Sequence, residues 1–188
     1  MSKTPSLLDS SGMLLPLSPT RILVVDDFAP FRAFVLSLFA ESTEFKVIGE
    51  AADGLEAVHT AEQLMPDLIL LDIGLPTLNG IDAARQICQL APDSKILFLS
   101  QESSADVVRE ALSVGAMGYV VKVDAGDELL AAVQAVRQGK RFVSSGLTGN
   151  FSDAAEPPTP DGRQLKAAPR SVASAGNKIP RSREAQFD

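Results

Sequence analysis

The chain has 188 residues, of which 45% are hydrophobic, and its formal net charge is −7. This acidic balance argues against a large basic surface, so we expect that the chain itself binds no nucleic acid. Cys88 is the only cysteine, which excludes an intrachain disulfide and a cysteine-based zinc cluster. No apolar run reaches the roughly 18–20 residues that a membrane-spanning helix needs, so we expect no membrane association and a cytoplasmic location.

Residues 1–20 carry a single lysine, and Asp9 and Pro16 interrupt their short apolar stretches. This composition is a poor match to a secretory signal peptide. We therefore interpret residues 1–20 as a flexible leader.

From residue 21 to residue 142, short apolar runs alternate with segments of helical periodicity. Such alternation with short connections is typical of an α/β fold that has a parallel sheet, helices on both faces and right-handed crossovers. We therefore predict one domain over residues 21–142, a five-stranded, doubly wound (βα)5 sheet. The predicted strands are 21–27, 45–51, 67–73, 95–100 and 118–122, and the predicted helices are 29–42, 53–64, 80–91, 105–115 and 126–139.

Residues 143–188 are rich in Pro, Gly, Ala and Ser and show no sustained periodicity. Such a segment buries too little apolar surface to offset the entropy lost on ordering. We expect residues 143–188 to be a linker or a disordered tail. No helix-turn-helix pattern is recognisable in it, and the final stretch, IPRSREAQFD, is too short to identify an output domain.

Chemically active side chains stand where the predicted strands end. Asp26 and Asp27 end the first strand, Asp72 the third, Ser100 the fourth and Lys122 the fifth. In a doubly wound sheet the carboxyl ends of the strands form the site, next to the point where the strand order reverses. A dense group of carboxylates is tolerable when a hard divalent cation neutralises it, and Mg²⁺ prefers oxygen ligands of this kind. The pattern therefore predicts a magnesium site.

The same motifs, in the same order, resemble one known family. VVDD, DLILLDIGLP, ILFLS and GAMGYVVK are similar to the strand-end motifs of response-regulator receiver domains (CheY-like) of two-component signalling. The resemblance covers residues 21–142, and GAMGYVVK with GKRFVSSGL is closest to the NarL/FixJ-type receivers, which are often fused to a helix-turn-helix domain. It implies a flavodoxin-like fold and a signalling domain that is a phosphoacceptor, not an enzyme acting on a separate substrate.

The resemblance also implies roles for individual residues. Asp72 would be the nucleophile that takes a phosphoryl group from a phosphohistidine and forms an aspartyl phosphate. Lys122 would pair with the phosphoryl oxygens. Ser100 would bond the phosphoryl group, and Tyr119 would change rotamer with it. Mg²⁺ would be held by Asp27 and Asp72, by the backbone carbonyl of Gly74, and by Asp26 mainly through water.

The partners that the resemblance implies are a histidine kinase or a phosphotransfer protein. The fourth helix, fifth strand and fifth helix would form the surface that repacks on phosphorylation and binds a partner or a second copy. The chain differs from many receivers at Val123, where a proline commonly follows the lysine.

Each of these residues also has an ordinary structural interpretation. Asp26 and Asp27, or Ser100, could cap the helix that follows; Asp72 could belong to a turn; Lys122 could be a surface lysine, and Tyr119 a half-buried strand residue.

Two other functional classes share a doubly wound sheet but need motifs that this chain lacks. An aspartate-nucleophile phosphatase needs a second acid two residues after the first, and Phe28 and Ala29 follow the acidic pair instead. A nucleotide-binding domain needs a glycine-rich loop after the first strand, and DDFAPFRA contains none.

A third possibility concerns the output. The chain could be the receiver part of a DNA-binding transcriptional regulator whose output domain is truncated or degenerate here.

Overall fold

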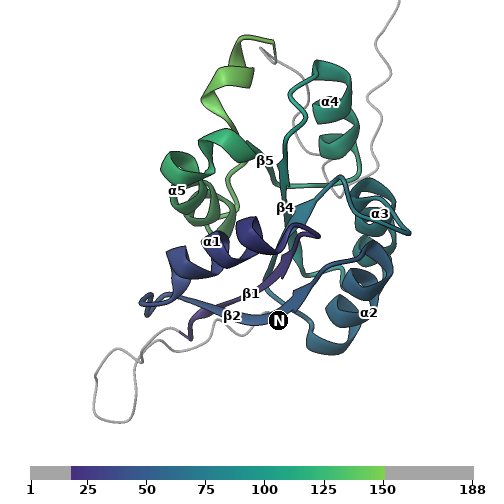
Figure 1. Cartoon of the computed structure of the whole chain (residues 1–188), viewed down its shortest axis with the longest axis vertical. Helices are drawn as coiled ribbons and strands as arrows, with labels where there is room; N and C mark the ends of the chain where they lie inside the picture. Colours follow the sequence, from purple (N-terminus) through teal and green to yellow (C-terminus); the bar gives the residue numbers. More distant parts are fainter. Residues whose placement is uncertain (1–17, 151–188) are drawn as a thin grey trace, which may run out of the picture. The chain divides into compact units, whose positions relative to one another are not determined.

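A computed structural model describes residues 18–150 of the chain (Figure 1). Strands and helices alternate along the described residues, as predicted. The strands are β1 (Thr20–Val25), β2 (Phe45–Ala51), β3 (Leu68–Asp72), β4 (Lys95–Ser100), β5 (Gly118–Val121) and β6 (Phe142–Val143). The α-helices are α1 (Ala29–Phe39), α2 (Gly54–Leu64), α3 (Gly80–Leu90), α4 (Ala105–Ser113) and α5 (Ala125–Arg137), and the short 3-10 helices are η1 (Lys122–Asp124) and η2 (Ser145–Asn150).

The strands form one parallel sheet in the order β2-β1-β3-β4-β5-β6. After β1 the chain goes to one side of that strand to form β2, and then to the other side to form β3. The strand order therefore reverses between β1 and β3, where a doubly wound sheet holds its site. The fold class is confirmed, with one correction: the sheet has a sixth, two-residue strand where five strands were predicted.

Helices cover both faces of the sheet, with α1 and α5 on one face and α2, α3 and α4 on the other (Figure 1). Because successive strand side chains point to opposite faces, Ile22 and Val24 pack with α1 and α5, whereas Leu23 and Val25 pack with the other helices. Every residue of β3 is buried, as expected for a strand that is covered on both faces.

Side-chain caps explain where two of the helices begin. Asp53 accepts hydrogen bonds from the amides of Leu55 and Glu56 at the start of α2, and Asn79 accepts one from the amide of Asp82 at the start of α3. Each cap satisfies amide groups that have no partner within the helix.

The predicted domain boundaries differ from the structure at the C-terminal side. Residues 143–150 were predicted to belong to a linker or tail, but they form the end of β6 and the helix η2. Their order has a physical cause, because Ser144 and Leu147 are buried against the domain. Residues 151–188 and residues 1–17 of the predicted leader lie outside the described residues. Among the described residues, none of the helices combines the length and apolar character needed to cross a membrane.

Candidate phosphorylation site

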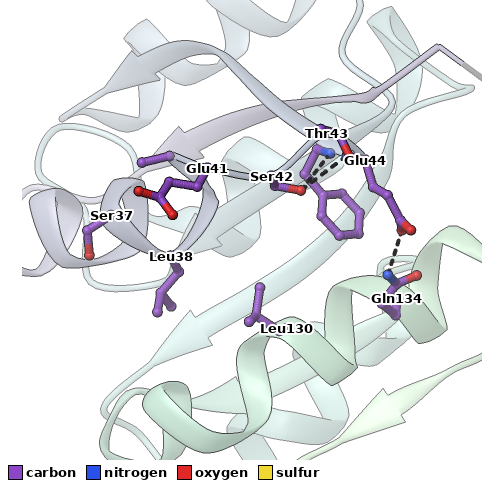
Figure 2. Close-up of a pocket in the computed structure, with 10 residues that line it drawn as sticks. Ser37, Leu38, Glu41, Ser42, Thr43, Glu44, Leu130 and Gln134 are labelled. Atoms are coloured by element: carbon purple, nitrogen blue, oxygen red, sulfur yellow. Dashed lines mark hydrogen bonds between the residues drawn. The ribbon is translucent and has the colours of Figure 1, made fainter.

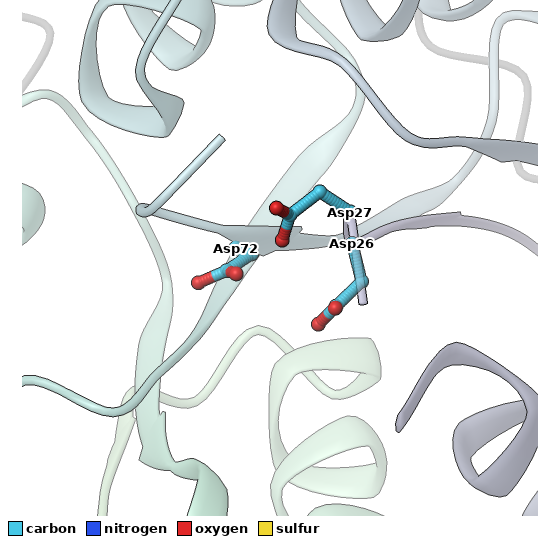
Figure 3. A group of neighbouring side chains, drawn as sticks. All are labelled: Asp26, Asp27 and Asp72. Carbon is cyan, nitrogen blue, oxygen red and sulfur yellow. The ribbon is translucent and has the colours of Figure 1, made fainter. Parts of the chain in front are cut away.

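The parallel pairing of β1 with β3 brings the three predicted carboxylates together. Val25 pairs with Leu71 in the sheet, so the residues that follow, Asp26 and Asp72, reach the same edge. Oxygen atoms of Asp26, Asp27 and Asp72 all lie within 4.8 Å of one another (Figure 3). Asp26 and Asp72 are buried, whereas Asp27 is exposed. The cluster is therefore open to solvent on the side of Asp27.

Lys122 reaches into this cluster from the end of β5. Its Nζ lies 2.7 Å from Oδ2 of Asp26 and 2.7 Å from Oδ2 of Asp72, and its side chain is only 8% exposed. The same ammonium lies 4.8 Å from the centre of the Phe31 ring, a favourable position for a cation over an aromatic face. One positive charge is thus shared by two buried carboxylates.

Burial and charge act in opposite directions on these groups. Burial raises the pKa of Asp26 because it disfavours the carboxylate, and the ammonium of Lys122 offsets only part of that effect. Burial alone would lower the pKa of Lys122, but the carboxylates of Asp26 and Asp72 outweigh it and raise that pKa. Lys122 therefore stays protonated, and the cluster favours additional positive charge.

The buried carboxylates accept few other hydrogen bonds. Oδ1 of Asp26 accepts from the amide of Phe28 at 3.0 Å, and Oδ1 of Asp72 accepts from the amide of Gly74 at 3.2 Å. Oδ2 of Asp26 is shielded from solvent and, among the described residues, has the ion pair with Lys122 but no hydrogen bond of normal geometry. Carboxylate oxygens are the ligands that a hard divalent cation prefers, so these residues fit the predicted Mg²⁺.

Ser100 and Tyr119 lie next to the cluster and are linked through one loop. Ser100 is buried at the end of β4, and its Oγ accepts a hydrogen bond from the amide of Glu102 at 3.2 Å. Tyr119 is fully buried on β5, and its hydroxyl donates to the carbonyl of Glu102 at 2.8 Å. Burial raises the pKa of Tyr119. Glu102 therefore connects the two predicted switch residues, a link that no sequence pattern indicated.

These contacts exclude most of the ordinary structural interpretations. The residue before α1 is Phe28, and α1 has no side-chain cap, so Asp26 and Asp27 do not cap that helix. Ser100 lies well before α4, whose preceding residue is Ser104. Lys122 is not a surface lysine and Tyr119 is not half-buried.

Two further residues shape the site without having been predicted to do so. Nη1 of Arg32 donates to the backbone carbonyl of Asp26 at 2.6 Å, while its Nε pairs with Glu50 at 3.1 Å. A Cβ atom on Gly80 would lie 1.9 Å from the carbonyl oxygen of Asp72. Glycine is thus required where α3 passes the backbone of Asp72, and Arg32 fixes the backbone of Asp26.

A pocket of about 280 Å³ opens over the cluster and is lined by Asp27, Phe28, Asp72, Ile73, Gly74, Ser100, Gln101, Glu102 and Lys122. A larger hollow of about 610 Å³ lies between the α1–β2 connection and α5 (Figure 2). In it, Gln134 donates a hydrogen bond to Glu44, and Leu38 and Leu130 supply apolar surface. The larger hollow contains neither a lysine nor a cluster of carboxylates. The smaller pocket is therefore the candidate site.

Comparisons with known proteins agree with this geometry. The family model described as "Response regulator receiver domain" matches residues 22–134. The transcriptional regulatory protein DegU of Brevibacillus brevis is 38% identical over 131 residues, covering 70% of this chain and 56% of DegU. The nitrate/nitrite response regulator protein NarL of Escherichia coli K12 is 33% identical over 130 residues, covering 69% of this chain and 60% of NarL.

A solved structure shows the same fold. The crystal structure of a LuxR-family two-component response regulator from Aurantimonas sp. SI85-9A1 superposes with a TM-score of 0.67 at 32% identity, covering 70% of this chain and 94% of that one. The chain spans less than two thirds of the length of DegU and of NarL. It belongs to the family of response regulator receiver domains, of the type found in NarL- and LuxR-family regulators.

Proposed function

We propose that this chain receives a phosphoryl group on Asp72 from the phosphohistidine of a partner, either a histidine kinase or a phosphotransfer protein. The observation that carries the proposal is the position of Lys122, whose Nζ is 2.7 Å from both Asp26 and Asp72 in a pocket open to solvent. An ammonium there can neutralise charge that a phosphoryl group would bring.

The reaction is a transfer of one phosphoryl group. A carboxylate oxygen of Asp72 forms the new P–O bond, the P–N bond to the donor imidazole breaks, and the electron pair of that bond stays on the imidazole. Such a transfer depends on positioning and charge neutralisation more than on covalent chemistry by the protein. The domain is the acceptor in this reaction and does not act on a separate substrate.

In this proposal, Asp27 and Asp72 would hold Mg²⁺ together with the backbone carbonyl of Gly74, and Asp26 would act mainly through water. The bound ion would neutralise negative charge on the transferring group. The grouping of three carboxylates within 4.8 Å supports this assignment.

Ser100 and Tyr119 are proposed to report the phosphorylated state. Phosphorylation adds charge and acceptor oxygens, to which Ser100 Oγ and Lys122 Nζ can donate. The backbone of Glu102 is hydrogen-bonded to both Ser100 and Tyr119. A displacement of Ser100 would therefore be transmitted through Glu102 to Tyr119 on β5. The surface formed by α4, β5 and α5 would then change its affinity for a partner or a second copy.

The proposal is tested by measuring the intact mass of the chain after incubation with acetyl phosphate, with and without Mg²⁺. We expect one phosphoryl addition that requires Mg²⁺ and is lost in Asp72→Asn. Asp93→Asn is the matched control, because Asp93 is exposed and precedes the amino end of β4, opposite the site. Addition that persists in Asp72→Asn would show that the acceptor is another residue.

A second candidate concerns the output of the signal. DegU is a transcriptional regulatory protein and NarL a response regulator, and this chain matches only 56% and 60% of their lengths. In this second candidate, the chain is the receiver part of a DNA-binding transcriptional regulator whose output domain is truncated or degenerate here. Electrophoretic mobility of mixed-sequence DNA with the 188-residue chain tests whether it binds DNA itself, and we expect no shift because of its net charge of −7.

A further inference from the structure

Residues 142–147 attach to the outer edge of β5 and lie outside residues 22–134, which the family model matches. We call this segment the clasp. Phe142 and Val143 pair in parallel with Gly118 and Tyr119. The amide of Ser144 donates to the carbonyl of Tyr119 at 2.9 Å. The clasp thereby occupies backbone groups that an edge strand would otherwise expose.

Two serines tie the clasp to both β5 and α5. Ser144 is fully buried, and its Oγ accepts a hydrogen bond from the amide of Val121 at 3.0 Å. Val121 is the residue directly before Lys122. Oγ and the amide of Ser145 donate to Oε1 of Glu128 on α5, at 2.7 and 3.1 Å. The clasp is thus bonded one residue away from the lysine of the candidate site.

Leu147 anchors the far end of the clasp in the core. It is 5% exposed and belongs to the same apolar cluster as Tyr119 and the α4 residues Val108 and Ala111. Its amide donates to the carbonyl of Ser144 at 2.9 Å, which closes the turn. The clasp therefore shares an apolar cluster with Tyr119 and also pairs with the strand that carries it.

Two routes of direct contact join the candidate site to the clasp. In one, Lys122 follows Val121, whose amide is bonded to Ser144. In the other, Ser100 is bonded to Glu102, Glu102 to the hydroxyl of Tyr119, and the carbonyl of Tyr119 to the clasp. Both routes end on Ser144.

We propose that phosphorylation of Asp72 opens the clasp and so couples the site to the segment that follows α5. This inference rests on the proposed function. In the structure, the clasp is closed and Nζ of Lys122 lies 2.7 Å from Oδ2 of Asp72. A phosphoryl group placed between the two displaces Lys122 and the end of β5, where Ser144 is attached. The neutral hydrogen bonds of Ser144 to β5 are weaker than the ion pairs of Lys122, so we expect them to open before those ion pairs break.

The test is amide hydrogen exchange in the full chain, measured by NMR with and without beryllofluoride and Mg²⁺, a mimic of the phosphoryl group. We expect the amides of Val121, Ser144 and Leu147 to exchange about fivefold faster or more when the mimic is bound. The amides of β2, on the opposite edge of the sheet, should not change. Mg²⁺ alone and Asp72→Asn with the mimic are the controls, and neither should accelerate exchange.

Unchanged or slower exchange of those three amides would overturn the proposal. Such a result leaves the proposed function intact if acetyl phosphate still modifies Asp72 in the mass measurement. Failure of that modification would instead reject the proposed function, so the two failures are distinguishable.

Thermodynamic coupling is reciprocal, which supplies a second test. If the mimic opens the clasp, variants that weaken the clasp must bind the mimic more tightly. We expect Leu147→Ala and Ser144→Ala to lower the beryllofluoride concentration at half-saturation. Leu90→Ala and Ser37→Ala are matched controls, because both residues are exposed, on α3 and α1, away from the α4, β5 and α5 surface. Equal half-saturation concentrations in the clasp variants and the control variants would refute the coupling. If a clasp variant fails to fold, the exchange measurement on the wild-type chain still tests the proposal.

Discussion

The strand β5 is held at two places by interactions of opposite character. At its carboxyl end, Lys122 forms ion pairs with two buried carboxylates, Asp26 and Asp72. Along its outer edge, the clasp holds it through neutral hydrogen bonds of Ser144 and the apolar side chain of Leu147.

The difference between these attachments lies in what their loss costs. Removing one partner of a buried ion pair leaves an uncompensated charge, which is strongly destabilising. Opening the neutral hydrogen bonds of Ser144 exposes polar groups that water can satisfy, so their loss costs less. The charged attachment therefore fixes the site in the absence of a phosphoryl group, whereas the clasp suits a part that opens when those charges rearrange.

The largest expected effect comes from removing the charge that balances the cluster. Lys122→Ala should lower the free energy of unfolding by about 3 kcal/mol in the absence of divalent cations, because it leaves Asp26 and Asp72 buried without a counter-charge. Chemical denaturation measures this. Lys46→Ala is the control, since Lys46 is exposed on β2.

A second substitution separates charge balance from lost packing. Asp26→Asn in the Lys122→Ala background should recover part of the stability, since burial already disfavours the ionised form of Asp26 and raises its pKa. If Asp26→Asn lowers stability further in that background, the loss in Lys122→Ala comes from packing against Phe31 and not from charge.

The clasp should give a smaller effect. Leu147→Ala is expected to lower the free energy of unfolding by about 2 kcal/mol, the lower end of the range for a buried leucine, because Leu147 lies at the edge of the core. Leu90→Ala, at an exposed position of α3, should change stability by less than about 0.5 kcal/mol. Equal losses in the two variants would mean that Leu147 contributes no anchoring.

The two attachments also differ in how far the sequence predicts them. Asp26, Asp72, Ser100 and Lys122 each end an apolar run, and parallel strands bring their carboxyl ends to one edge. Their convergence was therefore predictable, as were the alternation of elements and the doubly wound sheet. What the pattern could not supply is the pairing within the cluster, since one ammonium shared between two carboxylates depends on side-chain conformation.

The clasp lies within GKRFVSSGL, which resembles NarL/FixJ-type receivers, but its residues carry no comparable signal of secondary structure or burial. Its strand, Phe142–Val143, is too short to show the alternation that identifies a strand. The stretch Ser-Ser-Gly-Leu-Thr-Gly has the composition of a loop, and its one large apolar residue, Leu147, is isolated in the sequence. Its burial depends on an apolar cluster that includes Tyr119, Val108 and Ala111, which come together only after the domain has folded. Glu102 was missed for a similar reason, because it acts through its backbone and not its side chain.

The smallest expected effect is a pH dependence that belongs to the clasp alone. Partial burial would raise the pKa of Glu128, but the hydroxyls of Ser144 and Ser145 and the amide of Ser145 outweigh it and lower that pKa below its usual 4.5. A carboxyl whose pKa is lowered by folding stabilises the folded state above its unfolded pKa, and that contribution is lost as pH falls through the folded value.

Wild type and Glu128→Gln should therefore differ in unfolding midpoint near neutral pH and converge in acid, once Glu128 is protonated. Taking this difference cancels the titration of carboxylates common to both proteins, including those of the site. The exchange rates of Ser145 and Leu147 amides should converge over the same interval, because these residues belong to the clasp that Glu128 holds. A difference in midpoint that stays constant into acid would show that the carboxylate charge of Glu128 does not hold the clasp closed.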